Sequence, residues 1–135
     1  LKDQHFGIEI EMTGVTREKA AAIAAEYFGT TSSYIGSGYD AYAALDSQGR
    51  QWKFMSDSSI EAQRKNGNSR VSASGEYQTE MVSPICRYED IIPIQEIIRK
   101  LKEGGAAVSM CISMLRPLMP GRCGISPISW RLKRI

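Results

Sequence analysis

The feature that most constrains this chain is an alternating run from Phe6 to Thr13. Apolar side chains stand at every second position, Ile8, Ile10 and Met12, and the positions between them hold Gly7, Glu9 and Glu11. A period of two places these sets on opposite faces of a β-strand. One face can therefore enter a core, while the other presents two carboxylates side by side.

Two explanations of Glu9 and Glu11 follow from this pattern. Like charges this close repel and raise each other's pKa unless a cation lies between them. Two carboxylates on a rigid strand are a natural half-site for Mg²⁺, which prefers oxygen ligands. The plainer explanation is a half-exposed edge strand with an acidic polar face, and alternation is the commonest strand pattern. From these residues alone the edge strand is favoured.

Length, charge and cysteine content exclude several classes of protein. A chain of 135 residues suits one domain with its own core. A net charge of +2 gives no general case for binding nucleic acid or membranes. No apolar run is long enough to cross a membrane, and no signal pattern opens the chain. The cysteines are Cys86, Cys111 and Cys123. Their odd number and spacing argue against zinc and disulfides and predict a reducing cytoplasm.

Two helices are predicted, one before and one after a strand-rich segment of the sequence. Thr16 caps the first helix, which ends at Tyr27 or Phe28 before Gly29. The second runs from Tyr88 to Lys102, with an apolar stripe of isoleucines and Leu101. The single histidine, His5, excludes a multi-histidine metal site within this chain and receives no role.

The region between the helices predicts three strands and two loops. Residues 39–45 and 51–55 form a hairpin, and a third strand covers 76–83. Residues 30–38 are predicted as a loop. Residues 61–74 are predicted as a mobile solvent loop, with a lid over an anionic substrate as the alternative. The order β, α, β, β, β, α predicts an α+β domain with a mostly antiparallel sheet and helices on one face.

Polar residues follow the second hairpin strand. Trp52 and Phe54 share one face of that strand, which leaves Lys53 on the other. Asp57 comes directly after the strand, among hydroxyl side chains. An aspartate there either orders a turn or supplies a ligand at the sheet rim, and the turn is the more common role.

Three segments together resemble the bacterial putative amidoligase family, which is related to glutamine synthetase and glutamate–cysteine ligase. They are Phe-Gly-Ile-Glu-Ile-Glu-Met-Thr-Gly from Phe6, Gly-Arg-Gln-Trp-Lys-Phe-Met-Ser-Asp-Ser-Ser-Ile from Gly49, and Tyr-Gln-Thr-Glu-Met-Val-Ser-Pro-Ile from Tyr77. The resemblance extends from about Phe6 to Val108. It implies a glutamine-synthetase-like catalytic half-domain that joins a carboxylate to an amine through an acyl phosphate, with ATP and Mg²⁺ as cofactors.

The resemblance also implies roles for particular residues. Glu9, Glu11 and Glu80 would be metal ligands, and Glu80 would alternatively position the amine. Asp57 would lie at the same rim and, with Glu80, take part in catalysis. Lys53 and Arg50 would contact the ATP phosphates. The implied substrates are small-molecule or peptide amines and carboxylates.

The last part of the chain departs from the family pattern. The family continues with a strand carrying Cys-Gly-Ile-His-Val-His, whereas Val108 to Pro117 contains no histidine. The codons of Met110-Cys111-Ile112, read one base earlier, permit His-Val-His. We therefore divide the chain into residues 1–108, the N-terminal part of an amidoligase-like domain, and residues 109–135, a frameshifted tail that ends the chain early. The alternative is a genuine divergent tail.

The sequence thus predicts an amidoligase-type ligase whose active site is incomplete in this chain, with little or no turnover. The alternative is a non-catalytic binding module that keeps the sheet. A nucleic-acid binder using the basic tail is disfavoured by the low net charge and the absence of interleaved aromatics. Neither nucleic acid nor membrane is an expected partner, and the oligomeric state stays open.

Overall fold

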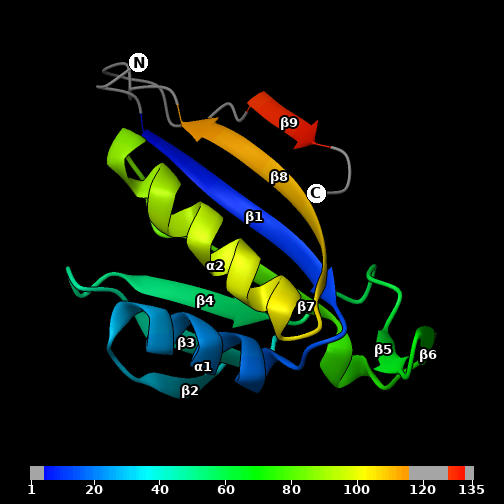
Figure 1. The fold of residues 1–135 in the computed structure, drawn as a ribbon. Coiled ribbons are helices and arrows are strands. Elements are labelled where there is room, and N and C mark those ends of the chain that lie inside the picture. Colours follow the sequence, from blue (N-terminus) through cyan, green and yellow to red (C-terminus); the bar gives the residue numbers. More distant parts are fainter. Residues whose placement is uncertain (1–4, 116–127, 133–135) are drawn as a thin grey trace.

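The computed structural model describes residues 5–115 and 128–132 (Figure 1). These residues form one seven-stranded sheet, a separate two-stranded ribbon and two α-helices. The sheet order is β2-β3-β4-β7-β1-β8-β9, and every neighbouring pair is antiparallel. The strands are β1 (His5–Thr13), β2 (Ser32–Gly36), β3 (Ala41–Leu45), β4 (Gln51–Met55), β7 (Thr79–Val82), β8 (Ala107–Leu115) and β9 (Ile128–Leu132).

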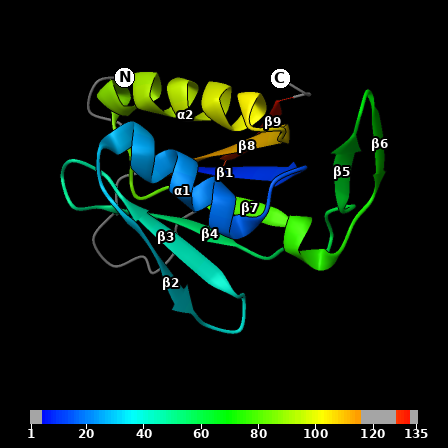
Figure 2. The same ribbon diagram turned by 60° about the horizontal axis from the view of Figure 1, so that its bottom comes forward.

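Both described helices, α1 (Arg17–Phe28) and α2 (Ile91–Glu103), lie on the same face of this sheet (Figures 1 and 2). The predicted α+β class, with a mostly antiparallel sheet and helices on one face, is confirmed. The opposite face of the sheet carries no helix among the described residues, and we call it the open face. In residues 5–115 and 128–132, no helix is both long and apolar enough to cross a membrane.

Strand β1 lies inside the sheet, between β7 and β8. Its partners on β8 run from Leu115 opposite His5 to Ala107 opposite Thr13. The edge-strand explanation of the alternating run is therefore wrong. The alternation itself is confirmed, because the apolar set points into the core. The exposed fractions of this set are Ile8 4%, Ile10 0% and Met12 1%.

Helix α1 begins and ends as its sequence predicts. The Thr16 side chain accepts a hydrogen bond from the backbone N–H of Lys19 at 3.2 Å, which satisfies one of the free donors of the first turn. Gly29 follows the helix with φ 70°, a left-handed conformation that glycine adopts without steric cost. The buried face is made mostly of alanines, and small side chains let this helix approach the sheet closely.

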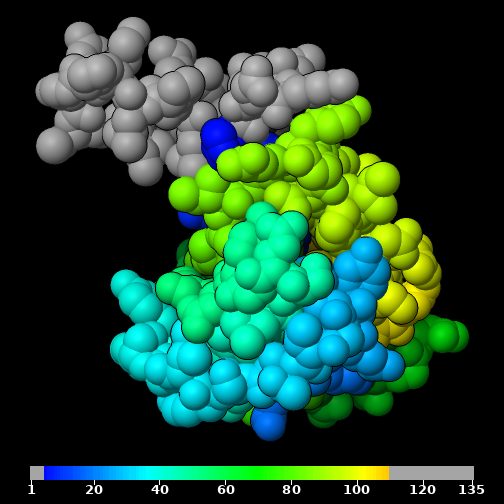
Figure 3. Space-filling model, turned by 90° about the vertical axis from the view of Figure 1, so that its left-hand side faces the viewer, coloured from blue at the N-terminus to red at the C-terminus, as the bar shows by residue number. Residues whose placement is uncertain are grey.

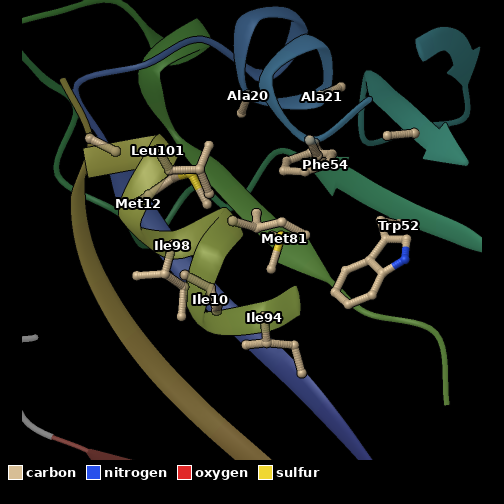
Figure 4. Packing of buried hydrophobic residues seen from close by; sticks show 14 of the residues in the cluster. Ile10, Met12, Ala20, Ala21, Trp52, Phe54, Met81, Ile94, Ile98 and Leu101 are labelled. Carbon is tan, nitrogen blue, oxygen red and sulfur yellow. The ribbon is translucent and has the colours of Figure 1, made fainter. Parts of the chain in front are cut away.

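The core lies between the sheet and the helices (Figure 4). Helices α1 and α2 also lie side by side, as the space-filling view from the side shows (Figure 3). The sheet contributes Ile10 and Met12 from β1, Trp52 and Phe54 from β4, and Met81 from β7. Helix α2 adds Ile94, Ile97, Ile98 and Leu101. The amphipathic pattern of α2 therefore predicts correctly which face of the helix packs against the sheet.

Several predicted boundaries are wrong. Residues 30–38 contain the edge strand β2, and residues 61–74 contain the ribbon strands β5 (Gln63–Asn66) and β6 (Ser69–Ser72). The strand predicted over 39–45 begins at Ala41, and the one predicted over 76–83 is preceded by a 3₁₀ turn, η1 (Gly75–Tyr77). A second 3₁₀ turn, η2 (Tyr88–Asp90), precedes α2. Strand β2 escapes detection because it buries no side chain, so it shows no apolar alternation.

The predicted division between residues 108 and 109 falls inside β8, which continues to Leu115. Its pairing with β1 continues without interruption on both sides of that division. Of the predicted tail, residues 116–127 and 133–135 lie outside the described residues.

Candidate functional site

Acidic side chains from two neighbouring strands meet on the open face of the sheet. Glu11 on β1 lies directly opposite Glu80 on β7, and Glu80 lies directly opposite Met55 on β4. Residues directly opposite each other in an antiparallel pair point their side chains to the same face. Because Met12 and Met81 fill the core, Glu11 and Glu80 face away from it.

A second row runs parallel to the first, two residues along each strand. Val82 on β7 lies opposite both Glu9 on β1 and Lys53 on β4. Glu9 and Lys53 are exposed, and Val82 is half-buried. Glu9, Glu11, Glu80 and Lys53 therefore share one face, although they come from three strands.

Asp57 stands at the end of β4, next to this face. Its Oδ1 accepts hydrogen bonds from the backbone N–H of Ser59 at 2.9 Å and from the Ser59 hydroxyl at 2.7 Å. These contacts order a turn, which is the plain role predicted for Asp57. The same aspartate is close enough for its charge to act on Glu80. We call Glu9, Glu11, Glu80 and Asp57 the carboxylate cluster.

The pKa of Glu80 reflects its burial and the negative charges of the carboxylate cluster around it. Its pKa is raised from an ordinary 4.5 to about 7. Burial is the largest cause, followed by the negative charges of Glu9, Asp57 and Glu11. None of the salt bridges formed by the described residues involves a member of the cluster. The cluster is thus a local excess of negative charge.

The carboxylate cluster does not form a closed metal cage in this conformation. Within the described ranges, no group of three or more His, Cys, Asp or Glu side chains is arranged to hold a metal ion. The donor chemistry nevertheless fits a hard cation, because all four groups offer carboxylate oxygens. Long glutamate side chains on a fixed strand pair could converge on an ion by rotamer changes alone, without moving the backbone.

Arg50 lies at the opposite end of β4 from Asp57 and contacts other carboxylates. Its guanidinium binds both oxygens of Asp90, at 2.8 and 3.0 Å, and donates from Nε to Asp46 Oδ2 at 2.8 Å. The pKa of Asp90 is lowered chiefly by the hydrogen bonds from this guanidinium. Arg50 thus joins the turn between β3 and β4 to the start of α2. The structure does not bring it to the carboxylate cluster.

Two residues that the sequence did not single out hold the rim in place. Gln78 donates from Nε2 to the backbone oxygen of Ile60 at 2.9 Å, which ties the Asp57 loop to the start of β7. Arg17, buried at the start of α1, donates to the backbone oxygen of Gln78 at 2.9 Å. It also pairs with Asp40 at 2.8 Å. These partners are far apart in sequence, so no local pattern indicates them.

Comparison with known proteins identifies the family of this chain. A family model described as "Putative amidoligase enzyme" matches residues 2–113, which include the whole carboxylate cluster and most of β8. No curated protein and no solved structure matches the chain. The resemblance found in three sequence segments therefore extends over most of the chain's length. The chain belongs to the putative amidoligase family.

Proposed function

We propose that this chain derives from an ATP- and Mg²⁺-dependent ligase that joins a carboxylate to an amine through an acyl phosphate. The family membership supports ligase chemistry in general. The observation that carries the proposal is the carboxylate cluster on the open face, where burial and the negative charges of the neighbouring carboxylates raise the pKa of Glu80 to about 7. Such a cluster calls for a cation. The substrates would be small-molecule or peptide amines and carboxylates.

In this proposal each side chain has a defined task. Glu9, Glu11 and Glu80 would hold Mg²⁺, which when bound offsets the charge of phosphate oxygens. Lys53, on the same face as Glu9, would contact a phosphate. Asp57 would complete the acidic rim, held there by its turn. Arg50 is not given a phosphate contact, because Asp46 and Asp90 already engage its guanidinium.

We further propose that turnover by this chain is low. The family's His-Val-His segment has no counterpart in the sequence of β8, where Met110-Cys111-Ile112 stands instead. A shift of reading frame near Ser109 would account for this difference. Sequencing of the DNA across the codons for residues 105–135 tests the idea, and a shifted frame that does not encode His-Val-His would refute it.

The odd number of cysteines favours a reducing cytoplasm as the location of the protein.

Calorimetry tests the site itself. We expect Mg²⁺-dependent ATP binding by the wild-type chain and its loss in Glu11→Gln, which removes a charge and keeps the side-chain shape. Glu61→Gln is the matched control, because Glu61 is exposed and is not part of the carboxylate cluster. Equal ATP binding by all three proteins would refute the metal role. Amine-dependent ADP release that Glu9→Ala abolishes would refute low turnover.

A second candidate is a non-catalytic binding module that keeps the sheet. The observation that favours it is that the described residues contain no group arranged to hold a metal ion. Under this alternative, neither Mg²⁺ nor ATP binds the wild-type chain in the same calorimetric experiment.

A further inference from the structure

The ribbon β5–β6 leaves the sheet at the rim that carries the carboxylate cluster. It projects away from the sheet and the helices (Figures 1 and 2). Its base is held at the end of β1: the backbone N–H of Gln63 donates to Thr13 Oγ1 at 2.7 Å, and that hydroxyl donates to the Gln63 oxygen at 3.0 Å. The Gly14 N–H donates to the same oxygen at 2.9 Å. Thr13 is only two residues from Glu11.

The ribbon carries positive charge only. Arg64 and Lys65 lie on β5 and Arg70 on β6, and no acidic residue occurs between Glu61 and Glu76. Lys65 lies directly opposite Arg70. Like charges in that position destabilise a strand pair. All three side chains are exposed, and none joins a salt bridge formed by the described residues.

Arg70 fixes one side of the ribbon to the domain. Its Nη2 donates to the backbone oxygen of Gly105 at 3.2 Å. Gly14, with φ 88°, makes this approach possible, because a Cβ there would lie 2.7 Å from Arg70 Nη1 and 2.3 Å from the Gly105 oxygen. Arg64 and Lys65 have no such contact among the described residues. They are therefore the cations most available to a partner.

The backbone of the ribbon is also available. Within the described ranges, β5 and β6 pair only with each other, so beyond Gln63, which bonds Thr13 and Gly14, the outer edge of each strand has no strand partner. An exposed strand edge can accept an extended peptide as an additional strand, with main-chain hydrogen bonds supplying affinity. The free strand edges and the uncompensated cations of the ribbon thus both suit a ligand that is extended and negatively charged.

We propose that the ribbon β5–β6 binds an extended acidic peptide as an added strand, with Arg64 and Lys65 contacting its carboxylates. The inference rests on the proposed function in one respect: the peptide is a substrate only if the carboxylate cluster is a ligase site, whereas its binding to the ribbon does not depend on that site. Nucleic acid is the less suitable polyanion. The ribbon carries no aromatic side chain on which a base could stack, and its cations are few.

Fluorescence anisotropy at low ionic strength tests the proposal, because screening weakens exposed ion pairs. The probe, called the Glu–Thr peptide, is a labelled peptide of Glu-Glu-Thr-Thr repeats. Arg64 and Lys65 are consecutive in β5 and point to opposite faces of the ribbon, and consecutive glutamates do the same on an added strand. We expect the double variant Arg64→Gln, Lys65→Gln to bind it about five- to tenfold more weakly, the effect of losing two exposed ion pairs. The double variant Lys19→Gln, Lys100→Gln is the matched control, because it removes the same charge from two helix positions outside the ribbon, Lys19 exposed and Lys100 half-buried. It should bind like the wild type.

A second probe separates charge from strand addition. A peptide of Glu-Glu-Pro-Pro repeats carries the same charge but lacks backbone N–H groups on both of its strand edges. We expect it to bind more weakly than the Glu–Thr peptide, and equal binding would overturn strand addition. Equal weakening by both double variants would overturn the role of the ribbon, as would tighter binding of a single-stranded oligonucleotide than of the Glu–Thr peptide.

One further variant keeps this inference distinguishable from the proposed ligase function. Glu11→Gln lies outside the ribbon and should leave binding of the Glu–Thr peptide unchanged while it removes Mg²⁺-dependent ATP binding. If the wild-type chain binds the peptide but not ATP, the ligase proposal fails and the ribbon proposal stands. If it binds ATP but not the peptide, the ribbon proposal fails and the ligase proposal stands.

Discussion

Replacing Glu80 by glutamine should stabilise the protein above neutral pH and change its stability little in mild acid. In the folded chain Glu80 has a pKa of about 7, against an ordinary 4.5. Below 4.5 the group is protonated in both the folded and the unfolded states. As the pH rises from 4.5 to 7, the unfolded chain releases this proton first, so the wild type loses stability. Glutamine does not ionise, and the variant avoids this loss.

The structure sets the size of the effect. One pKa unit corresponds to about 1.4 kcal/mol, so the full difference between 4.5 and about 7 would correspond to about 3 kcal/mol. Glu80 is only half-buried, and solvent screens the charges of Glu9, Glu11 and Asp57 that act on it. We therefore expect the variant to gain about 1–2 kcal/mol in free energy of unfolding at pH ~8.

Urea unfolding at pH ~5 and pH ~8, followed by circular dichroism, measures this difference. The comparison that matters is the gain of Glu80→Gln over wild type at each pH, since groups that do not interact with Glu80 titrate equally in both proteins. Glu61→Gln is the control for loss of an acidic charge outside the carboxylate cluster, and it should show no such pH dependence. A Glu80→Gln variant that is destabilised, or whose gain is the same at both pH values, would refute the charge-crowding argument.

Three further substitutions test the fold. Arg50→Gln should lower the free energy of unfolding by about 2–3 kcal/mol at neutral pH, because it leaves Asp46 and Asp90 without their cation. Since the pKa values of both aspartates are lowered in the folded state, this loss should shrink as the pH falls below about 4, and a pH-independent loss would contradict the pairing. Gly29→Ala should cost about 1 kcal/mol in urea unfolding, because φ is 70° and no atom within 4 Å would meet the new Cβ; an unchanged midpoint would argue against the left-handed cap. Trp52→Phe should cost about 1–3 kcal/mol, because it removes the buried hydrogen bond from Nε1 to Asp46 Oδ2 at 3.0 Å, and a neutral effect would mean that the bond contributes nothing.

Local patterns predicted the elements that bury an apolar face. The alternation around Ile10 gave the direction of the β1 side chains, and Thr16 and Gly29 gave the limits of α1. The position of β1 inside the sheet could not be predicted in this way, because period two is the same in edge and central strands. Only the pairing with β7 and β8 distinguishes the two cases.

The missed elements bury little apolar side-chain surface. Strand β2 exposes nearly all of its side chains, and in the ribbon β5–β6 the only apolar residue is Val71. Their strand conformation comes from pairing with a neighbouring strand, and the sequence of one segment alone does not show that pairing. The contacts of Arg50 are equally hard to predict, since its partner Asp90 lies forty residues along the chain.

The candidate site was predicted only in part. Glu9 and Glu11 stand out in the sequence because they alternate with buried residues. Asp57 was identified from the residues alone only as a turn residue or a ligand at the sheet rim, and Glu80 received a role only through the family resemblance. Their convergence depends on register, which places Glu80 opposite Glu11 and lets Gln78 hold the loop after Asp57. Register between distant strands is a tertiary property, and no spacing in the sequence encodes it directly.

The central position of β1 has a consequence for how the chain acquires its structure. Strand β1 leaves the ribosome well before β7 and β8, the two strands with which it pairs. Pairing over such long sequence separations must overcome a large loop-closure entropy, which slows folding. Until Ala107 and the rest of β8 are synthesised, one edge of β1 stays unpaired and its apolar face is incompletely covered. We expect nascent chains that stop before β8 to depend on chaperones, and the carboxylate cluster to form among the last features of the fold.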